Sequence, residues 1–196
     1  MSRGLVIVGG CYAAAQIAAS AREAGYAEPI RIVSQEAFAP YQRPPLSKGF
    51  LTGKVPQAAL PLRGEAFYRE NRVELLLDTR ATRIDRASRV VETADGQRLS
   101  FDKLALAVGA RPRPLPIPGS DLDGVLELRS LADSLAIRER LADASSVVIV
   151  GNELGPQTLP ANGSLVVRPI TNTTYTLTAY APGGQTVSVT ISVFVR

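Results

Sequence analysis

A glycine turn close to the start of the chain has the composition of an anion-binding site. Gly9-Gly10-Cys11 follows the apolar run 5–8 and precedes an alanine-rich stretch from about Tyr12 to Ala24. The apolar run predicts a buried parallel strand, and the stretch after the turn predicts a helix closed by Gly25. The turn would direct free N–H groups and the positive end of the helix dipole towards one point. This unit therefore predicts a site for the pyrophosphate of a dinucleotide.

A second unit of the same kind begins near Ser145 but is not completed. The apolar residues 147–150 and Gly151 are followed by Asn152-Glu153-Leu154-Gly155-Pro156, where a glycine turn and a helix would be expected. Pro156, and the lack of an apolar 3.6-residue pattern beyond it, argue against that helix. Glu153 would also repel a phosphate. We expect no second nucleotide site at this position.

The elements that would position these residues alternate between strands and helices. Expected strands cover 4–8, 30–34, 73–77 and 103–108, and expected helices cover 12–24, 57–60 and 64–71. Three further strands, at 80–86, 89–94 and 98–101, predict a β-meander with Asp95-Gly96 as a hairpin turn of the favoured type. A proline-rich connector at 111–119 leads to a helix that ends near Ala142, and Ser130 with Asp133 predicts a capping box at its start.

The composition excludes several classes of site. Of the 196 residues, 45% are hydrophobic and 20% are charged, and the chain has one Cys and no His. An intrachain disulfide, a Cys-x-x-Cys pair, a His-dependent triad and a His-ligated zinc are therefore excluded, and we expect no metal site. No apolar run approaches the roughly 18 residues of a membrane span, and no signal-peptide pattern is present. These features predict a cytoplasmic protein without membrane association.

The net charge of +4 is spread without dense basic runs. Nucleic-acid binding would call for a basic stripe with interleaved aromatic residues, so we expect no nucleic-acid partner. The charge suits either a solvated surface or the attraction of an acidic protein partner.

The composition changes near residue 156. All 18 acidic residues precede it, whereas the last 41 residues contain no acid and 8 threonines. Apolar residues alternate with Thr and Ser at 174–179 and 186–195, Pro182-Gly183-Gly184 would join these runs, and a shorter strand is expected at 164–168. This pattern predicts a short antiparallel β-rich extension. It resembles the last strands of bacterial immunoglobulin-like repeats, and it either pairs with another chain, covers the preceding domain or is a fusion remnant.

Three runs in the first part of the chain occur in the order found in one enzyme family. They are VIVGG at 6–10, PYQRPPLSK at 40–48 and AVGARPR at 107–113. Together they resemble the FAD-dependent ferredoxin and rubredoxin reductases, and the likeness extends to Gly151. The resemblance implies a Rossmann-like FAD-binding domain. In that family the flavin accepts hydride from NAD(P)H and passes single electrons to a small iron–sulfur or rubredoxin-type protein.

The resemblance implies a role for each matching residue. Gly9 and Gly10 would form the pyrophosphate turn, and Glu36 would accept hydrogen bonds from the adenosine ribose. Arg43 would lie near the dinucleotide. Lys48 would lie beside the flavin ring and stabilise negative charge on the reduced flavin, which makes it the catalytic candidate. The other implied cofactor contacts are Cys11, Tyr12, Ala13, Ala14, Ala107, Val108, Gly109 and Arg111.

Some of these residues also have interpretations without a cofactor. The run 40–45 could be a polyproline ligand for an SH3-like partner, and Arg43 and Lys48 could be ordinary surface charges. The joint occurrence of the three motifs, in register, favours the functional interpretation.

Cys11 departs from the family, which has a glycine here so that the backbone can approach the pyrophosphate. A side chain at this position would crowd the phosphates, so we expect Cys11→Gly to increase the FAD bound per chain. A redox-active Cys11 is the alternative, although the chain holds no second cysteine to resolve it.

We therefore expect residues 1–110 to form an incomplete FAD-binding Rossmann-like domain with a β-meander. Residues 111–155 would supply a connector helix and the first strand of a truncated NAD-binding domain, and 156–196 an immunoglobulin-like β-rich fragment. The expected function is the FAD-binding part of an NAD(P)H-dependent ferredoxin or rubredoxin reductase-like oxidoreductase, inactive alone, with its NAD(P)H site lost. Expected partners are a complementing subunit and a small acidic ferredoxin or rubredoxin. The alternative is a non-catalytic binding or adhesion module that uses the β-rich tail.

Overall fold

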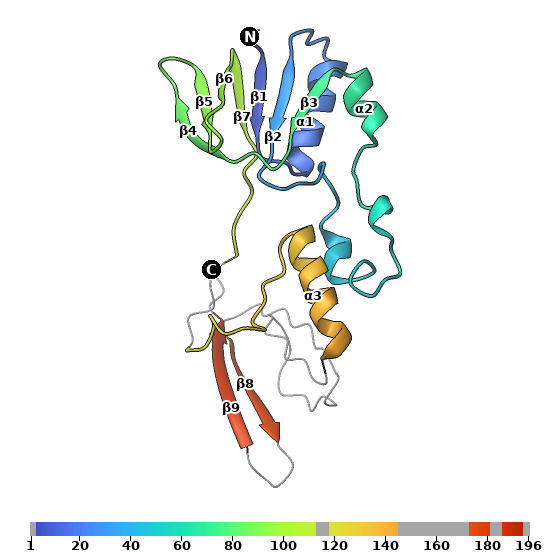
Figure 1. The fold of residues 1–196 in the computed structure, drawn as a ribbon, viewed down its shortest axis with the longest axis vertical. Coiled ribbons are helices and arrows are strands. Elements are labelled where there is room, and N and C mark those ends of the chain that lie inside the picture. Colours follow the sequence, from blue (N-terminus) through green and yellow to red (C-terminus); the bar gives the residue numbers. More distant parts are fainter. Residues whose placement is uncertain (1–2, 113–117, 145–172, 181–185, 194–196) are drawn as a thin grey trace. The chain divides into compact units, whose positions relative to one another are not determined.

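The computed structural model describes residues 3–112, 118–144, 173–180 and 186–193 (Figure 1). The chain divides into two units, Met1–Arg138 and Glu139–Arg196, each of which is described by itself. The first unit has the α/β fold expected from the sequence. The domain boundaries expected at residues 110 and 155 were drawn between regions of different function, and they stay predictions.

A four-stranded parallel sheet forms the centre of the first unit. Its strands are β1 (Leu5–Val8), β2 (Ile30–Val33), β3 (Val73–Leu76) and β7 (Lys103–Leu106), in the order β3-β2-β1-β7. Val8 pairs with Val33 on one side and with Leu106 on the other. The carboxyl ends of β1, β2 and β7 therefore meet at one edge of the sheet, which is where dinucleotides bind in folds of this kind.

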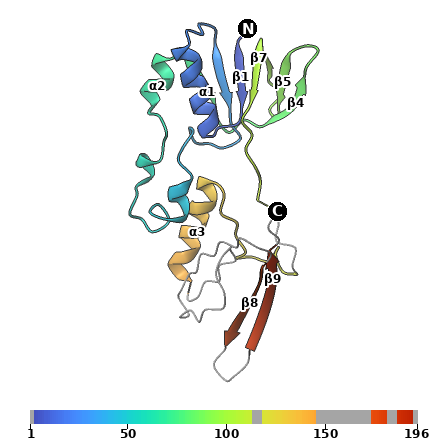
Figure 2. The ribbon, with the colours of Figure 1, turned by 180° about the vertical axis from the view of Figure 1, so that it is seen from behind.

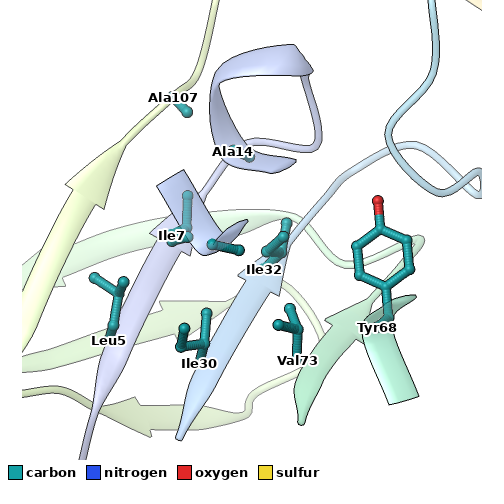
Figure 3. Packing of buried hydrophobic residues seen from close by; sticks show 9 residues of the cluster. Leu5, Ile7, Ala14, Ile30, Ile32, Tyr68, Val73 and Ala107 are labelled. Carbon is teal, nitrogen blue, oxygen red and sulfur yellow. The ribbon is translucent and has the colours of Figure 1, made fainter. Parts of the chain in front are cut away.

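The apolar run of β1 is buried on both faces, as expected for a central parallel strand. Its alternate residues enter two different clusters because side chains on a strand alternate in direction. Leu5 and Ile7 pack with Ile30, Ile32 and residues of α1 (Tyr12–Glu23) and α2 (Glu65–Glu70). Figure 3 shows this face of the sheet, with Ile7 and Ile32 close to Ala14.

The opposite face of the sheet is covered by the meander of β4 (Ala81–Asp85), β5 (Val90–Thr93) and β6 (Arg98–Ser100). Val6, Val8 and Val33 pack there against Val91 and Leu99. The views in Figures 1 and 2 agree that α1 and the meander lie on different sides of the sheet. The domain is therefore layered as helices, parallel sheet and meander.

The hairpin between β5 and β6 lies where the sequence placed it, but its turn differs. The N–H of Thr93 bonds the carbonyl of Gln97 across three residues, and Gly96 has a φ of +84°. Asp95 does not have the positive φ that a two-residue type I′ turn requires. The turn therefore has three residues, with glycine last. The expectation that Asp95-Gly96 alone forms a two-residue turn was wrong.

The segment between β2 and β3 carries the proline-rich run. Residues Pro44–Ser47 form a 3-10 helix, η1, and Gln57–Ala59 form a second one, η2, in place of the helix expected at 57–60. Leu46 and Phe50 are buried with Tyr41, Leu60 and Leu131 in a third cluster. The run is thus packed into the domain and is not an extended polyproline ligand.

The helix α3 (Leu131–Asp143) begins at the capping box predicted from the sequence. The N–H of Ser130 donates to Oδ2 of Asp133 at 2.6 Å, and the N–H of Asp133 donates to Oγ of Ser130 at 3.2 Å. This reciprocal pair satisfies two N–H groups at the helix start.

The second unit contains the strands β8 (Thr173–Tyr180) and β9 (Thr186–Val193), paired antiparallel from Thr173↔Val193 to Tyr180↔Thr186. The hairpin expected from the alternating pattern is therefore confirmed. Three expected features lie outside the described residues: the turn at 182–184, the strand at 164–168 and the incomplete second nucleotide motif at 147–156. Among the helices that the structure describes, none has the length and hydropathy needed to cross a membrane.

Candidate functional site

Gly9 occupies a position that other residues could not take. Its φ is +115°, and a Cβ there would lie 2.0 Å from the carbonyl oxygen of Ala107. The N–H of Gly9 bonds the carbonyl of Val33 at 2.8 Å, and the N–H of Ala107 bonds the carbonyl of Val8 at 2.8 Å. The turn after β1 is thus held between the ends of the two neighbouring strands.

Position 10 must be glycine because of a different neighbouring residue, Ser34. A Cβ at Gly10 would lie 2.3 Å from Oγ and 2.6 Å from Cβ of Ser34, the buried residue that follows β2. A distance below 3.0 Å is not sustained by real Cβ atoms. Glycine here therefore lets the turn and the end of β2 come into contact.

The first turn of α1 presents unpaired donors. The first bond of the helix runs from the N–H of Ala15 to the carbonyl of Cys11 at 3.2 Å, so the N–H groups before Ala15 have no partner within the helix. Cys11 makes no side-chain cap, and the first turn carries no acidic residue. Tyr12 and Ala13 are exposed, whereas Ala14 is buried against the sheet. This arrangement is suited to an anion.

Cys11 directs its sulfur towards the strand end beside it. The thiol donates a hydrogen bond to the carbonyl of Ala107, with Sγ and O 3.2 Å apart. The expectation that Cys11 weakens FAD binding stays a prediction.

Glu36 lies three residues beyond the end of β2 and two beyond Ser34. The N–H of Glu36 donates to Oγ of Ser34 at 3.1 Å, and the Ser34 hydroxyl donates to the carbonyl of Glu36 at 3.3 Å. The residue that touches Gly10 thus also fixes the backbone of Glu36. The pyrophosphate turn and the candidate ribose carboxylate are linked through this single serine.

The carboxylate of Glu36 has two partners from the proline-rich run. Nη2 of Arg43 lies 2.5 Å from Oε1, and the hydroxyl of Tyr41 donates to Oε2. Nη1 of Arg43 donates to the Tyr41 hydroxyl at 3.2 Å, and the guanidinium lies 5.2 Å from the centroid of the Tyr41 ring. Glu36, Tyr41 and Arg43 form what we call the carboxylate cluster.

The cluster changes the acidity of its members. Burial, and the hydrogen bond to Glu36, raise the pKa of Tyr41 well above its usual value. Burial by itself would lower the pKa of Arg43, but the hydrogen bond to Glu36 and the nearby negative charges raise it instead. The tyrosine therefore stays a hydroxyl donor and the arginine a cation over the physiological range.

The carboxylate cluster also contacts the segment that starts α3. The Tyr41 hydroxyl accepts a hydrogen bond from the N–H of Leu131 at 2.8 Å, and Nη1 of Arg43 donates to the carbonyl of Arg129 at 2.7 Å. Nη2 of Arg129 would lie 3.6 Å from a Cβ on Gly109. Neither Tyr41 nor Arg129 was expected to have a role, although Tyr41 stands inside the PYQRPPLSK run.

Lys48 follows η1 and has an exposed side chain. Its N–H bonds the carbonyl of Pro45 at 2.9 Å, and the buried Leu46 and Phe50 anchor the backbone on both sides. Within the described part of the chain, its ammonium group has no hydrogen-bond or ion-pair partner. No contact joins Lys48 to the carboxylate cluster in that part of the chain.

The crossing after β7 brings three more of the expected residues to the same edge. The strand ends at Leu106, two residues earlier than expected, and the buried Ala107 contacts the turn as described. Val108 is 68% exposed, and Gly109 has a φ of +66°. Arg111 is exposed. An exposed valine beside the glycine turn leaves an apolar surface next to the free N–H groups.

The profile of the pyridine nucleotide-disulphide oxidoreductases matches residues 3–153. The chain belongs to this family. The match spans the parallel sheet, the meander and the proline-rich run, which are the parts that build the site.

Relatives and solved structures agree with this assignment. A rubredoxin-NAD(+) reductase of Pseudomonas putida is 43% identical over 147 residues, which cover 75% of this chain and 38% of that protein. The ferredoxin reductase for the CYP199A2 system of Rhodopseudomonas palustris superposes with a TM-score of 0.72 at 37% identity, covering 76% of this chain and 37% of that one. The covalent putidaredoxin reductase–putidaredoxin complex gives a TM-score of 0.65 at 36% identity, covering 71% of this chain and 34% of that one.

Membership of the pyridine nucleotide-disulphide oxidoreductases implies that the chain binds FAD, and the residues present fit that cofactor. Free N–H groups at the start of α1 suit a pyrophosphate, and the carboxylate of Glu36 at the end of the adjacent strand suits a ribose diol. The chain spans less than two fifths of the length of the P. putida relative.

Proposed function

We propose that this chain is the FAD-binding part of an NAD(P)H-dependent ferredoxin or rubredoxin reductase-like oxidoreductase. The observation that supports this most is the pairing of an uncapped α1 N-terminus with the Glu36 carboxylate at adjacent strand ends. The first offers donors to two linked phosphates and the second offers acceptors to a ribose. When bound, the flavin would accept a hydride and release single electrons.

The protein residues would hold and orient that cofactor. The backbone N–H groups at Cys11 and Tyr12 would donate to the pyrophosphate, and Gly9 and Gly10 would keep the turn free of side chains. Glu36 would accept from the adenosine ribose. Ala107, Val108 and Gly109 would line the crossing beside the cofactor, with Arg111 and Arg43 adding positive charge near the phosphates.

Lys48 is the proposed catalytic residue. Its exposed ammonium group lacks a partner in the described part of the chain, and its backbone is fixed by the two buried neighbours Leu46 and Phe50. A cation with this freedom can lie beside a flavin ring and stabilise the negative charge of the reduced state. Such a role would be seen as a lower flavin reduction potential in Lys48→Met with FAD still bound.

The nicotinamide site and the electron acceptor form a further part of the proposal. Glu153 replaces a fingerprint glycine after Gly151, outside the described residues, and we propose that NAD(P)H does not bind there. A complementing subunit would then supply the nicotinamide site. In the described residues β7 pairs only with β1, and Leu106 on that edge strand is 63% exposed, which supports association at this edge. A small acidic ferredoxin or rubredoxin would suit the net charge of +4.

The experiment that tests the proposal is an FAD titration of the full chain, read by flavin fluorescence and by the visible spectrum after gel filtration. We expect stable binding by the wild type and weaker binding by Glu36→Ala, by about tenfold for the loss of a charged hydrogen-bond acceptor. Glu65→Ala, in the exposed first turn of α2, is the matched control and should bind as the wild type. A wild-type chain that elutes free of FAD contradicts the proposal.

A non-catalytic binding or adhesion module is the second candidate. The observation in its favour is the long β8–β9 hairpin, whose eight-residue strands form a two-stranded sheet among the described residues. Its sequence resembles the end of an immunoglobulin-like repeat. A colourless protein that self-associates or binds a partner through this hairpin would support the module and count against the reductase.

A further inference from the structure

The hydroxyl of Tyr41 has a complete set of partners. A tyrosine hydroxyl can donate one hydrogen bond and accept two. This one donates to Glu36, and it accepts from the N–H of Leu131 at 2.8 Å and from Arg43 at 3.2 Å. Tyr41 is only 4% exposed, so its ring cannot turn away without breaking the packing around it. The hydroxyl is therefore fixed in position.

The Glu36 carboxylate can accept more hydrogen bonds than it receives from Tyr41 and Arg43. An ionised carboxylate has about four acceptor positions. Tyr41 uses one on Oε2 and Arg43 uses one on Oε1, which in the described part of the chain leaves about two, one on each oxygen. The Glu36 side chain is 21% exposed, so the free side can be reached from solvent. Two remaining acceptors held in a fixed orientation match the two hydroxyls of a ribose.

We propose that Tyr41 is the positioning residue of the adenosine site, holding Glu36 for a ribose diol and linking that carboxylate to the start of α3. The inference deepens the proposed function and rests on it. Tyr41 does not contact the nucleotide in this account. It acts by fixing the orientation of Glu36 on its donor side and by holding the N–H of Leu131 on its acceptor side.

This arrangement has a consequence for the helix. A diol bound to Glu36 restrains the carboxylate, and the carboxylate restrains the tyrosine hydroxyl that Leu131 bonds. Ligand binding at the ribose site should therefore reduce opening at the start of α3. The link requires no change of fold, because every contact in it exists in the present structure.

The test compares Tyr41→Phe with the wild type, using ADP and 2′,3′-dideoxy-ADP as probes in calorimetric titrations of the full chain. We expect ADP to bind about tenfold more weakly to Tyr41→Phe, since one charge-assisted hydrogen bond that orients Glu36 is lost. Binding of the dideoxy compound, which has no ribose hydroxyls, should be the same in both proteins. Tyr68→Phe is the matched control, because Tyr68 is also a buried tyrosine but its hydroxyl has no partner among the described residues.

A second measurement needs no variant. Amide hydrogen exchange at Leu131 in the wild type should slow when ADP is added and should be unaffected by the dideoxy compound, which decides the question even if Tyr41→Phe does not fold. Equal ADP affinities in both proteins, or equal effects of the two nucleotides on exchange at Leu131, overturn the inference. The proposed function still stands in that case if the wild type binds FAD. A wild type that binds neither FAD nor ADP overturns both.

Discussion

The contact between Gly10 and Ser34 gives a quantitative test of why the turn contains two glycines. In Gly10→Ala the new Cβ would lie 2.3 Å from Oγ and 2.6 Å from Cβ of Ser34, which is itself buried. Gly10 does not have a positive φ, so the backbone itself accepts alanine and the penalty comes from overpacking alone. Overpacking of this kind lowers the free energy of unfolding by about 1–3 kcal/mol.

Removing the obstructing side chain should reverse most of this loss. Ser34→Gly alone loses the hydroxyl bonds to Glu36 and gains backbone freedom, at about 1–2 kcal/mol in total. In the double variant the nearest remaining Ser34 atom, Cα, would lie 3.7 Å from the new Cβ, which is ordinary contact. We therefore expect the two changes to couple by about 1–2 kcal/mol, the double variant being more stable than the sum predicts.

The assay is urea unfolding of the cofactor-free chain, with the midpoint and slope compared across the four proteins. Gly64→Ala is the control, because a Cβ there meets no atom of the described residues within 4 Å. Its effect should stay below about 1 kcal/mol. Additivity of Gly10→Ala and Ser34→Gly within about 0.5 kcal/mol would refute the steric explanation. It would also mean that Gly10 serves the ligand alone.

Three further predictions each concern the contacts of a single side chain. Tyr68→Phe removes a buried hydroxyl for which the described segments supply no partner, so the free energy of unfolding should stay the same or rise by up to about 1 kcal/mol. A clear loss in urea unfolding would contradict this reasoning. Asp133→Ala removes one half of the α3 capping box and should destabilise the start of the helix by about 0.5–2 kcal/mol, measured by amide exchange near Ser130; unchanged exchange would show that the box contributes nothing. Because the folded pKa of Tyr41 lies above its unfolded value of 10.0, the stability it contributes is complete below that pH and is lost as the pH rises further. Urea unfolding at pH values from about 10 upwards should therefore show a steeper loss in the wild type than in Tyr41→Phe, and equal slopes would argue against the raised pKa.

The parts of the fold that depend on local patterns could be predicted from the sequence. The apolar run before Gly9 gives β1, because a strand buried on both faces needs no alternation. Ser130 and Asp133 are three residues apart, so the capping box is visible in the sequence itself. The alternating tail likewise predicts the β8–β9 hairpin.

The carboxylate cluster could not be predicted in the same way. Its contact between Tyr41 and Leu131 joins residues 90 positions apart, and that between Arg43 and Arg129 joins residues 86 positions apart. Such contacts depend on how the proline-rich run packs on the start of α3, and no spacing in the sequence encodes them. The thiol bond of Cys11 to Ala107 was missed for the same reason, since it spans 96 positions.

The type of the hairpin turn at residues 94–96 was predicted wrongly for a smaller reason. Asp-Gly occurs in both two-residue and three-residue turns, and the difference depends on whether the aspartate takes a positive φ. Here the Thr93 hydroxyl bonds the N–H of Gln97 at 3.0 Å, which stabilises the longer turn. That bond is also a side-chain contact that the dipeptide alone does not reveal.

The central claim is that the glycine turn and the carboxylate cluster hold FAD. The most direct measurement is the ratio of FAD to protein after the full chain has been incubated with excess FAD and passed through a desalting column, for the wild type and for Cys11→Gly. We expect visibly yellow protein that retains FAD in both cases, with more FAD per chain in Cys11→Gly than in the wild type. Colourless protein in both cases, with the fold intact by circular dichroism, would contradict it.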